Sequence, residues 1–274
     1  MAAAPDLPRL SLPRDLCRDP HLAVRREWLV TNGIGGFAAG TVAGALTRRY
    51  HGLLLAALRP PLGRTLLVAK LDETVTIAGG VYPLATNIWT TGIESPAGCE
   101  WLDEFAVIGG VPTWRYIVAD TPLSKRIWME HGRNATFVQY SLPADARPLE
   151  LAARLLVNCR DYHTLTRGEQ RPMRGEARGA ELTIHPGDHA GAIRARCAGP
   201  APDGAHWRLD HTWYRRFYLP VEADRGYDHI EDHLSAGVCQ VTLQPGTTAT
   251  FVLATEADAD VAIDGAFDRC LGRA

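Results

Sequence analysis

Carboxylates that could carry out acid–base chemistry gather in two stretches of the chain. Asp103 and Glu104 are adjacent, and a second group lies between Glu222 and Asp232. Hydrolysis of a glycosidic bond needs one carboxylic acid to donate a proton and a second carboxylate to act as base or nucleophile. Separation along the chain does not give the separation of two carboxyl groups in space, so the spacing identifies no catalytic pair. We therefore assign no catalytic residue from it.

Two histidines, His229 and His233, stand four residues apart around acidic residues. The zinc-protease pattern H-E-x-x-H needs glutamate directly after the first histidine, where this chain has Ile230, and the inverted form needs glutamate where Asp232 stands. No third ligand with suitable spacing is evident. The pattern favours a polar loop or a contact with sugar or another domain. We predict no metal site. Among the possible functions of this chain, a metal-dependent hydrolase is therefore the least favoured.

The segment from Gly33 to Ala38 fits the loose dinucleotide fingerprint G-x-G-x-x-A. That fingerprint requires a helix directly after the glycines and an acidic residue about 20 residues further on. After these glycines the chain runs into Thr47–Gly52, and no acidic residue occurs before Asp72. We predict a tight loop that brings the backbone close to a partner or a sugar, and no cofactor.

Aromatic side chains are a further candidate feature, because flat rings stack well on sugar rings. Most of the tryptophans lie in strand-like runs, where core packing is the simpler interpretation. Trp213 differs, since it sits beside Tyr214 and among His211, Arg215 and Arg216. Burying these polar and charged side chains without hydrogen-bond partners would cost free energy, so we expect them at the surface, where they suit a ligand rich in hydroxyl groups.

Charge and composition exclude several classes of partner. The 29 basic residues nearly balance the 31 acidic ones, so no basic stripe is available for nucleic acid or for an anionic membrane. The segment from Met1 to Arg14 lacks the apolar run of a signal peptide, which predicts a cytoplasmic protein. The six cysteines form no C-x-x-C pair, so we expect reduced and mostly buried thiols.

Strand-like patterns dominate the chain. Residues 149–157 alternate apolar and polar side chains, which is typical of a half-buried strand. Short breaks that suit hairpins, such as Gly79-Gly80 and Pro245-Gly246, separate many of the runs. This organisation predicts an all-β fold in one domain, a large antiparallel β-sandwich. The other expected strands are 27–31, 52–58, 65–77, 113–119, 123–130, 135–142, 193–197, 212–219, 238–243 and 248–255.

One helical pattern occurs, near the carboxyl end. Val261, Phe267 and Leu271 have helix-like spacing in residues 258–271, and acidic residues come early, where a helix dipole favours them. We expect a short helix there that leads into a further part of the protein.

The motif running from Glu27 to Phe37, through Gly40–Gly44 and on to Arg48–Leu54, closely resembles the opening motif of archaeal and bacterial glycogen debranching enzymes. Further blocks of the chain resemble the same amino-terminal region, and the resemblance extends from about Arg26 to Thr255. These blocks are Gly63–Thr65, Lys70–Glu73, Asn158–His163, Glu222–Asp228 and Glu231-Asp232.

The resemblance implies a β-rich domain of the super-sandwich kind found at the amino terminus of glucoamylase-like enzymes. It divides the chain into an extension (1–25), the sandwich (26–256), and a linker or helix (257–274) toward an (α/α) barrel that is absent here and supplies the catalytic carboxylates. The implied activity of the complete protein is amylo-α-1,6-glucosidase, with 4-α-glucanotransferase activity in some relatives. The expected partners are glycogen or another branched α-glucan and the protein's own barrel.

Polar residues in turn-like contexts are the candidates for substrate or barrel contacts. We expect segments 49–51, 160–163 and 225–232 to converge on one face, since loops at one end of a sandwich become neighbours. A purely structural ion-pair network is the alternative for these residues, and a free-standing carbohydrate-binding module is the alternative for the chain. The candidates are Asn32, Arg49, Tyr50, His51, Arg160, Asp161, His163, Trp213, Arg225, Asp228, Glu231 and Asp232.

Overall fold

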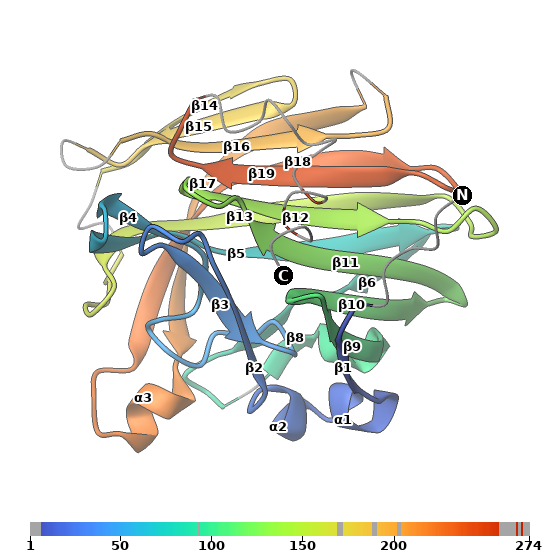
Figure 1. Cartoon of the computed structure of the whole chain (residues 1–274), viewed down its shortest axis with the longest axis horizontal. Coiled ribbons are helices and arrows are strands. Elements are labelled where there is room, and N and C mark those ends of the chain that lie inside the picture. Colours follow the sequence, from blue (N-terminus) through green and yellow to red (C-terminus); the bar gives the residue numbers. More distant parts are fainter. Residues whose placement is uncertain are drawn as a thin grey trace.

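The computed structural model describes residues 7–92, 94–168, 172–187, 191–201 and 204–257, together with Phe267 and Cys270. Two large antiparallel sheets pack against each other in this part of the chain, and their long strands cross the molecule in Figure 1. The expected all-β antiparallel sandwich is therefore confirmed. None of the described helices has the length and apolar character needed to cross a membrane.

The nine-stranded sheet combines strands from both ends of the chain. Its amino-terminal edge is β1, and its other edge is the β14–β15 hairpin. In spatial order its strands are β1 (Arg9–Leu12), β9 (Leu102–Ile108), β10 (Val111–Val118), β11 (Thr121–Met129), β12 (Ala135–Ser141), β19 (Thr248–Ala254), β16 (Ile193–Ala198), β15 (Glu181–His185) and β14 (Arg174–Arg178).

The eight-stranded sheet contains the longest strands and most of the segments that resemble the debranching family. A separate two-stranded sheet pairs β7 (Thr86–Ile88) with β8 (Glu94–Ala97). In the eight-stranded sheet the spatial order of the strands is β17 (Ala205–Tyr218), β18 (Ile230–Leu243), β13 (Leu149–Asp161), β5 (Leu62–Ile77), β4 (Gly52–Arg59), β3 (Phe37–Thr41) and β2 (Glu27–Thr31), and β6 (Gly80–Pro83) pairs with β5.

Each run of residues expected as a strand lies in a strand of the structure, but several boundaries differ. The largest difference is at β18, which begins at Ile230 although the apolar pattern predicts a start at 238. Its first residues include Glu231 and His233, whose polar side chains are buried against partners far away in sequence. Strands of small or polar residues, such as β3 and β14, carry too weak an alternation to be predicted.

The turn at Pro245-Gly246 does not form the expected hairpin. Strand β18 before it pairs with β13 and β17, whereas β19 after it pairs with β12 and β16. The turn therefore carries the chain from one sheet to the other, and the hairpin prediction for this turn is wrong. Turn residues alone report a reversal of direction, not which strand the chain joins next.

Residues before the expected start of the sandwich also pack on it. Strand β1 pairs with β9, and the short helices α1 (Arg14–Arg18) and α2 (Pro20–Ala23) follow it. Cys17 and Ala23 have no exposed surface and belong to the main core. The helix expected over 258–271 falls outside the described residues, apart from Phe267 and Cys270.

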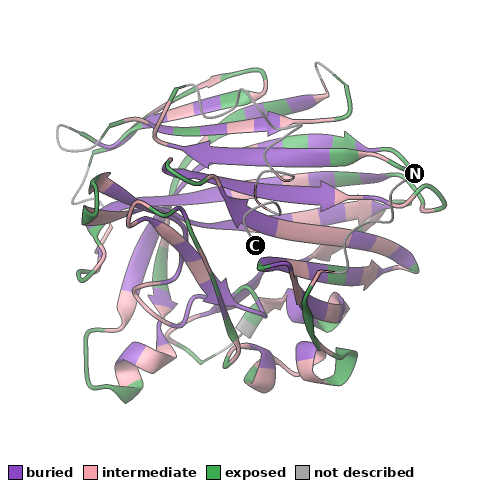
Figure 2. Cartoon of the chain, viewed as in Figure 1, coloured by how far each residue is buried: buried purple, intermediate pink, exposed green. Residues whose placement is uncertain are grey.

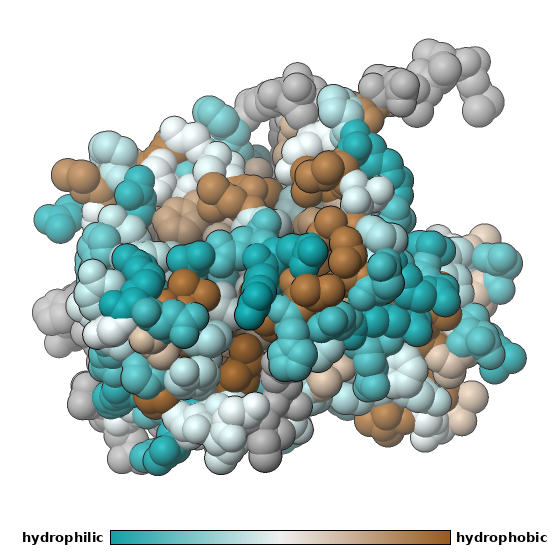
Figure 3. Space-filling model, turned by 90° about the horizontal axis from the view of Figure 1, so that it is seen from below, coloured by the Kyte–Doolittle hydropathy of each residue, from teal (hydrophilic) through white to brown (hydrophobic). Residues whose placement is uncertain are grey.

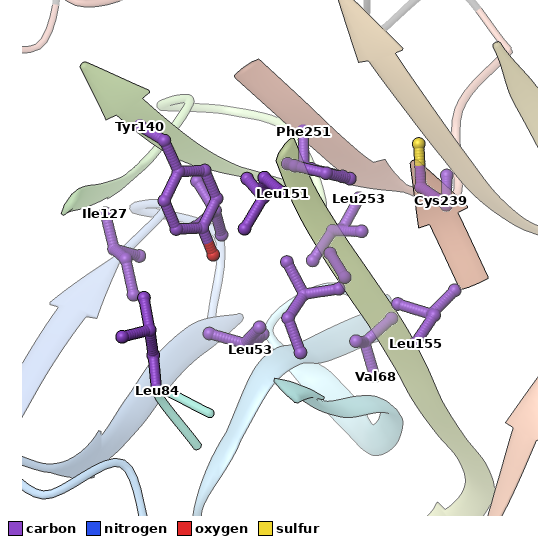
Figure 4. Packing of buried hydrophobic residues seen from close by; sticks show 14 of the residues in the cluster. Leu53, Val68, Leu84, Ile127, Tyr140, Leu151, Leu155, Cys239, Phe251 and Leu253 are labelled. Atoms are coloured by element: carbon purple, nitrogen blue, oxygen red, sulfur yellow. The ribbon is translucent and has the colours of Figure 1, made fainter. Parts of the chain in front are cut away.

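The main core lies between the two sheets. Figure 4 shows Val68 and Leu155 of the eight-stranded sheet together with Phe251 and Leu253 of the nine-stranded sheet pointing into the shared interior. Figure 2 shows the same pattern at the scale of the molecule, with buried residues along the long strands and exposed residues in turns. The cysteines are reduced, and all but Cys270 are buried.

The outer face of the eight-stranded sheet is also covered, which is unusual for an antiparallel sheet. Leu54 belongs to the main core, whereas Leu55 belongs to a second apolar cluster with Leu156 and Phe217. Leu46 and Leu219, from segments outside the sheet, complete this cluster. The chain before β4 and the connection after β17 therefore fold over the outer face, and this fold positions the candidate site.

Replacing Leu155 with Ala tests the position of the core. Leu155 has no exposed surface, so the substitution leaves a cavity between the sheets and is expected to lower the free energy of unfolding by about 2 to 5 kcal/mol. Leu29→Ala is the matched control, because Leu29 is 60% exposed and its loss should change stability by under about 0.5 kcal/mol. Urea unfolding measures both free energies. An equal loss of stability in the two variants would contradict the position of Leu155 in the core between the sheets.

Candidate functional site

Three segments distant in sequence meet over the outer face of the eight-stranded sheet. They are residues 47–51 before β4, residues 160–168 at and after the end of β13, and residues 219–232, which contain helix α3 (Pro220–Asp224) and the start of β18. The backbone N–H of Val221 donates to Thr47 O over 3.2 Å, which joins the first and third segments. We call this meeting point the polar junction. Figure 3 shows the side of the molecule that carries α3, where hydrophilic residues predominate.

A buried ion pair between Arg160 and Glu231 lies at the centre of the polar junction. The Arg160 side chain is 1% exposed and the Glu231 side chain is 2% exposed. The guanidinium contacts both carboxylate oxygens, with Nη2 2.9 Å from Oε2 and Nε bonded to Oε1. This bidentate geometry is the strongest form of an arginine–carboxylate contact. Arg160 Nη2 also donates to Arg49 O over 2.8 Å, so the pair reaches the first segment as well.

Arg49 joins all three segments through one side chain. Its Nη1 donates to His163 O over 2.7 Å, and its Nη2 donates to Asp228 O over 3.3 Å. The carboxylate of Glu222, which has no exposed surface, accepts a hydrogen bond from the Arg49 backbone N–H and lies 3.1 Å from Nη2. The guanidinium also stands over the ring of Tyr227, 5.2 Å from its centroid. Substitution of Arg49 therefore removes contacts to the second and third segments together.

Aromatic rings form the solvent-facing rim of the polar junction. The Tyr162 and His163 ring centroids are 3.9 Å apart, and Tyr50 meets both rings at 5.6 to 5.7 Å. Tyr50 OH lies 3.2 Å from His163 Nδ1, and the Arg64 guanidinium stands 5.6 Å from the Tyr162 centroid. His163 is exposed, while the tyrosines are half-buried. Rings and charged donors held in this way can contact a hydroxyl-rich ligand.

A second layer of polar groups lies beneath the ion pair. Asn158 Nδ2 is 3.1 Å from His233 Nδ1, so this ring nitrogen is assigned as the acceptor and the imidazole as neutral. Burial lowers the pKa of the His233 imidazole to about 4, and the charges of Arg160 and Lys70 act in the same direction. Thr166 donates its hydroxyl to Asn158 Oδ1 over 2.7 Å, which fixes the second segment on the sheet.

Most of the residues expected at the site lie in or beside the polar junction. Asp161 Oδ1 accepts from the His163 N–H over 2.9 Å and so holds the turn after β13. Asp228 pairs with Arg167 at 2.5 Å, and Arg225 stands 3.7 Å from Glu222 Oε2. Together with these three, the structure brings together Arg49, Tyr50, Arg160, His163 and Glu231.

Asp232 and Trp213 lie at the edge of the polar junction. Asp232 Oδ2 accepts from the Gly168 N–H over 2.5 Å, and its Oδ1 accepts from the Arg216 N–H over 2.8 Å. A Cβ atom at Gly168 would lie 3.5 Å from the Trp213 ring. These two side chains thus hold the end of the second segment, and Trp213 packs partly on the main core.

Asn32 lies outside the polar junction, and the His51 ring binds within its own segment, where Nδ1 accepts from the Thr47 N–H over 3.1 Å. His51 is 3% exposed and lies 3.5 Å from Glu27 Oε1. Its hydrogen bond lowers the pKa of the Glu27 carboxyl to about 2, with Arg48 adding to the effect. Asn32 is fully buried, accepts from the Gly36 N–H over 2.9 Å, and donates to Asn134 Oδ1 over 3.1 Å. Both side chains therefore hold the loops in which they lie.

The glycine motif forms the turn between β2 and β3, with no helix after it. Gly35 has φ of 100°, and a Cβ atom there would lie 2.6 Å from Pro61 O. The close approach that the glycines allow is thus made to another turn of the same domain. A dinucleotide fingerprint needs a helix in this place, so that interpretation does not hold.

The two histidines do not lie on a helix either. His233 is within β18, and His229 precedes that strand with its Nδ1 2.9 Å from Tyr227 O. Within the described ranges, no group of three or more His, Cys, Asp or Glu side chains is placed to hold a metal ion.

Glu222, Tyr162 and Arg167 also lie in the polar junction, although they are not among the site residues expected from the sequence. The signal for Glu222 was its place in a block that resembles the debranching family, next to Arg225 and Asp228. Tyr162 lies between two selected residues, Asp161 and His163. Arg167 gave no signal, because its partner Asp228 is 61 positions away.

The pH dependence of the unfolding free energy tests whether the buried His233 imidazole is neutral in the folded protein. Unfolded histidine takes up a proton near pH 6.5, whereas folded His233 does so near pH 4, so this group's contribution to stability falls as the pH falls between those values. The loss is roughly 3 kcal/mol over that interval. His233→Gln should flatten the dependence of unfolding free energy on pH, and the exposed control His206→Gln should not. Parallel pH profiles for all three proteins would contradict the assignment.

The family model described as glycogen debranching enzyme N terminal matches residues 26–250. No curated protein matches the chain. One similar solved structure is a bacterial glucoamylase complexed with acarbose, with a TM-score of 0.39 at 9% sequence identity. The likeness covers 89% of this chain and 34% of the glucoamylase chain, so this chain spans about one third of that protein. Because the family model covers most of the 274 residues, the chain belongs to the glycogen debranching enzyme N-terminal family.

Proposed function

We propose that the chain is the non-catalytic amino-terminal domain of an amylo-α-1,6-glucosidase and that its polar junction helps to shape the substrate site. In this proposal the junction faces the (α/α) barrel that supplies the catalytic carboxylates, and it orients a branched α-glucan at the mouth of the barrel. The observation that carries the proposal is the convergence of three distant segments on the Arg160–Glu231 pair, with an aromatic rim facing solvent.

Rigidity of the rim supports a role in orientation. Arg49 holds the backbone carbonyls of His163 and Asp228, and Asp161 fixes the turn that carries His163. A surface that is fixed before the ligand arrives loses less conformational entropy on binding, and correct placement of a reacting bond contributes directly to rate.

The carboxylates of the polar junction support a non-catalytic role. Glu222 and Glu231 are at most 1% exposed, and each is engaged by an arginine. An acid–base pair for glycoside hydrolysis must reach the scissile bond from both sides, with carboxyl groups about 5 to 9.5 Å apart. Asp228 reaches solvent, but its carboxylate is engaged by Arg167.

The isolated chain should release no glucose from a branched limit dextrin. The reason is that its central carboxylates are buried and arginine-bound, so they cannot act as acid and base. Glucose measured by a coupled assay should equal the buffer control, and the full-length enzyme should serve as the positive control. Release that scales with the concentration of the isolated chain would contradict the non-catalytic role.

His163→Ala in the full-length enzyme tests the role of the rim. The substitution removes an exposed ring and the partner of Tyr50 OH, while the Arg49 contact to the backbone carbonyl remains. If the lost contact acts in the transition state, turnover of branched substrate should fall about tenfold to a hundredfold, as expected for 1.5 to 3 kcal/mol. The melting temperature should change little.

His206→Ala is the matched control, because His206 is an exposed histidine of β17 whose partner is Gln240, outside the polar junction. Its turnover should equal that of the wild type. Unchanged turnover in His163→Ala would assign the rim a structural role only.

A further inference from the structure

Arg216 combines a bulky side chain with a backbone conformation that favours glycine. Its φ of 69° lies in the left-handed region, which bulky residues rarely adopt. Among the described residues, the other non-glycine residues with positive φ are Ala78, Ala119 and Asp120. These three lie in the short turns between β5 and β6 and between β10 and β11, where tight hairpin turns require positive φ. Arg216 instead lies within strand β17.

The left-handed residue belongs to a bulge in β17. The pairing of β17 with β18 shifts register between Tyr214 and Phe217, so residues 215 and 216 stand opposite the single residue Asp232. The Arg216 N–H donates to Asp232 Oδ1 over 2.8 Å, which holds the bulge. Bulges redirect side chains and are frequent beside binding sites. Glycine would adopt this conformation without steric cost, so the arginine side chain is the feature that needs an explanation.

The Arg216 side chain reaches a neighbouring hairpin. Its Nε donates to Thr90 Oγ1 over 3.0 Å. Thr90 follows β7, which is anchored by Lys70, since Lys70 Nζ donates to Thr86 O over 2.9 Å and to Asn87 Oδ1 over 2.8 Å. Arg216 is exposed, and no carboxylate in the described part of the chain forms an ion pair with it. The N–H donors on its Nη atoms are therefore available to a ligand.

Two half-buried aromatic rings come from the segments that meet at Arg216. Trp89 precedes Thr90, and its ring centroid lies 4.6 Å from that of Phe217. Trp89 and Tyr214 both pack on the second apolar cluster, on which Tyr162 of the polar junction packs as well. The rim of the polar junction and these two rings therefore border the same apolar floor. Flat rings beside free guanidinium donors suit a neutral, hydroxyl-rich ligand.

We propose that Trp89, Tyr214 and Arg216, which we call the bulge site, bind a glucosyl unit of an α-glucan chain next to the unit contacted by the rim of the polar junction. The inference rests on the proposed function, because it takes the same substrate, and it adds a second contact along the chain. The rings stack on the sugar, and the Nη donors bind its hydroxyl oxygens. The bulge then serves to direct the guanidinium toward the Thr90 hairpin.

Calorimetric titration of the whole chain with maltoheptaose, a linear α-glucan, tests the bulge site. Arg216→Gly keeps the bulge, because glycine accepts its φ, and removes the guanidinium. The dissociation constant should rise about tenfold or more, as expected when a charged hydrogen-bond donor is lost. The melting temperature should stay within about 3 °C of the wild type, because relief of the left-handed backbone offsets the lost Thr90 contact.

Two further variants complete the experiment. Trp89→Leu keeps apolar volume over Phe217 but removes the stacking face, so it should also weaken binding about tenfold. Arg208→Ala is the matched control, because Arg208 is an exposed arginine of the same strand, outside the bulge. It should bind maltoheptaose as tightly as the wild type.

Three results would overturn the proposal. The first is wild-type affinity in Arg216→Gly, which would leave the arginine only its contact with Thr90. The second is saturable binding of inorganic phosphate but not of maltoheptaose, which would make the bulge site an anion site. The third is no saturable binding of maltoheptaose to the wild-type chain. Each result leaves the turnover test of His163→Ala unaffected, so failure of the bulge site is distinguishable from failure of the proposed function.

Discussion

The Arg160–Glu231 ion pair is the interaction on which the candidate site depends. Removal from water costs each charge several kcal/mol, so the pair forms only where geometry and additional hydrogen bonds compensate for that cost. Arg49 O of the first segment, the Thr166 N–H of the second segment and the Asn158 side chain of β13 supply those bonds. The requirement to satisfy two buried charges therefore fixes the segments in one arrangement. We assign the pair a role in specifying this arrangement more than in adding stability.

The outer faces of the two sheets carry different apolar clusters. Apolar residues such as Leu55 and Leu156 lie beneath the polar junction, whose charged side chains cover them and still present an aromatic rim to solvent. On the nine-stranded sheet, Trp128 contacts Phe267 edge-to-face and stacks on Phe137.

The sequence predicts those features that depend on local pattern. Alternation in residues 149–157 predicts β13, and segments that flank strands at one end of a sandwich were expected to converge, as they do around Arg49. Prediction from sequence fails where long-range partners decide the structure. The pattern of Ile230–His233 indicates a polar loop, but these residues begin β18. Their partners Arg160 and Asn158, which bind Glu231 and His233, are about 70 residues away in the chain. Asn32 lies in the strongest motif, yet its amide is used by its own turn and by Asn134, which only the folded structure reveals.

A double-mutant cycle on Arg160 and Glu231 tests the central claim most directly. Unfolding free energies are measured for Arg160→Met, Glu231→Met and the double variant. Each single change leaves one buried charge without its partner and should lower stability by about 3 to 5 kcal/mol. The double variant removes both charges and should be clearly more stable than the sum of the single losses predicts. Additive losses, or single losses under about 1 kcal/mol, would contradict the claim that this pair holds the polar junction together.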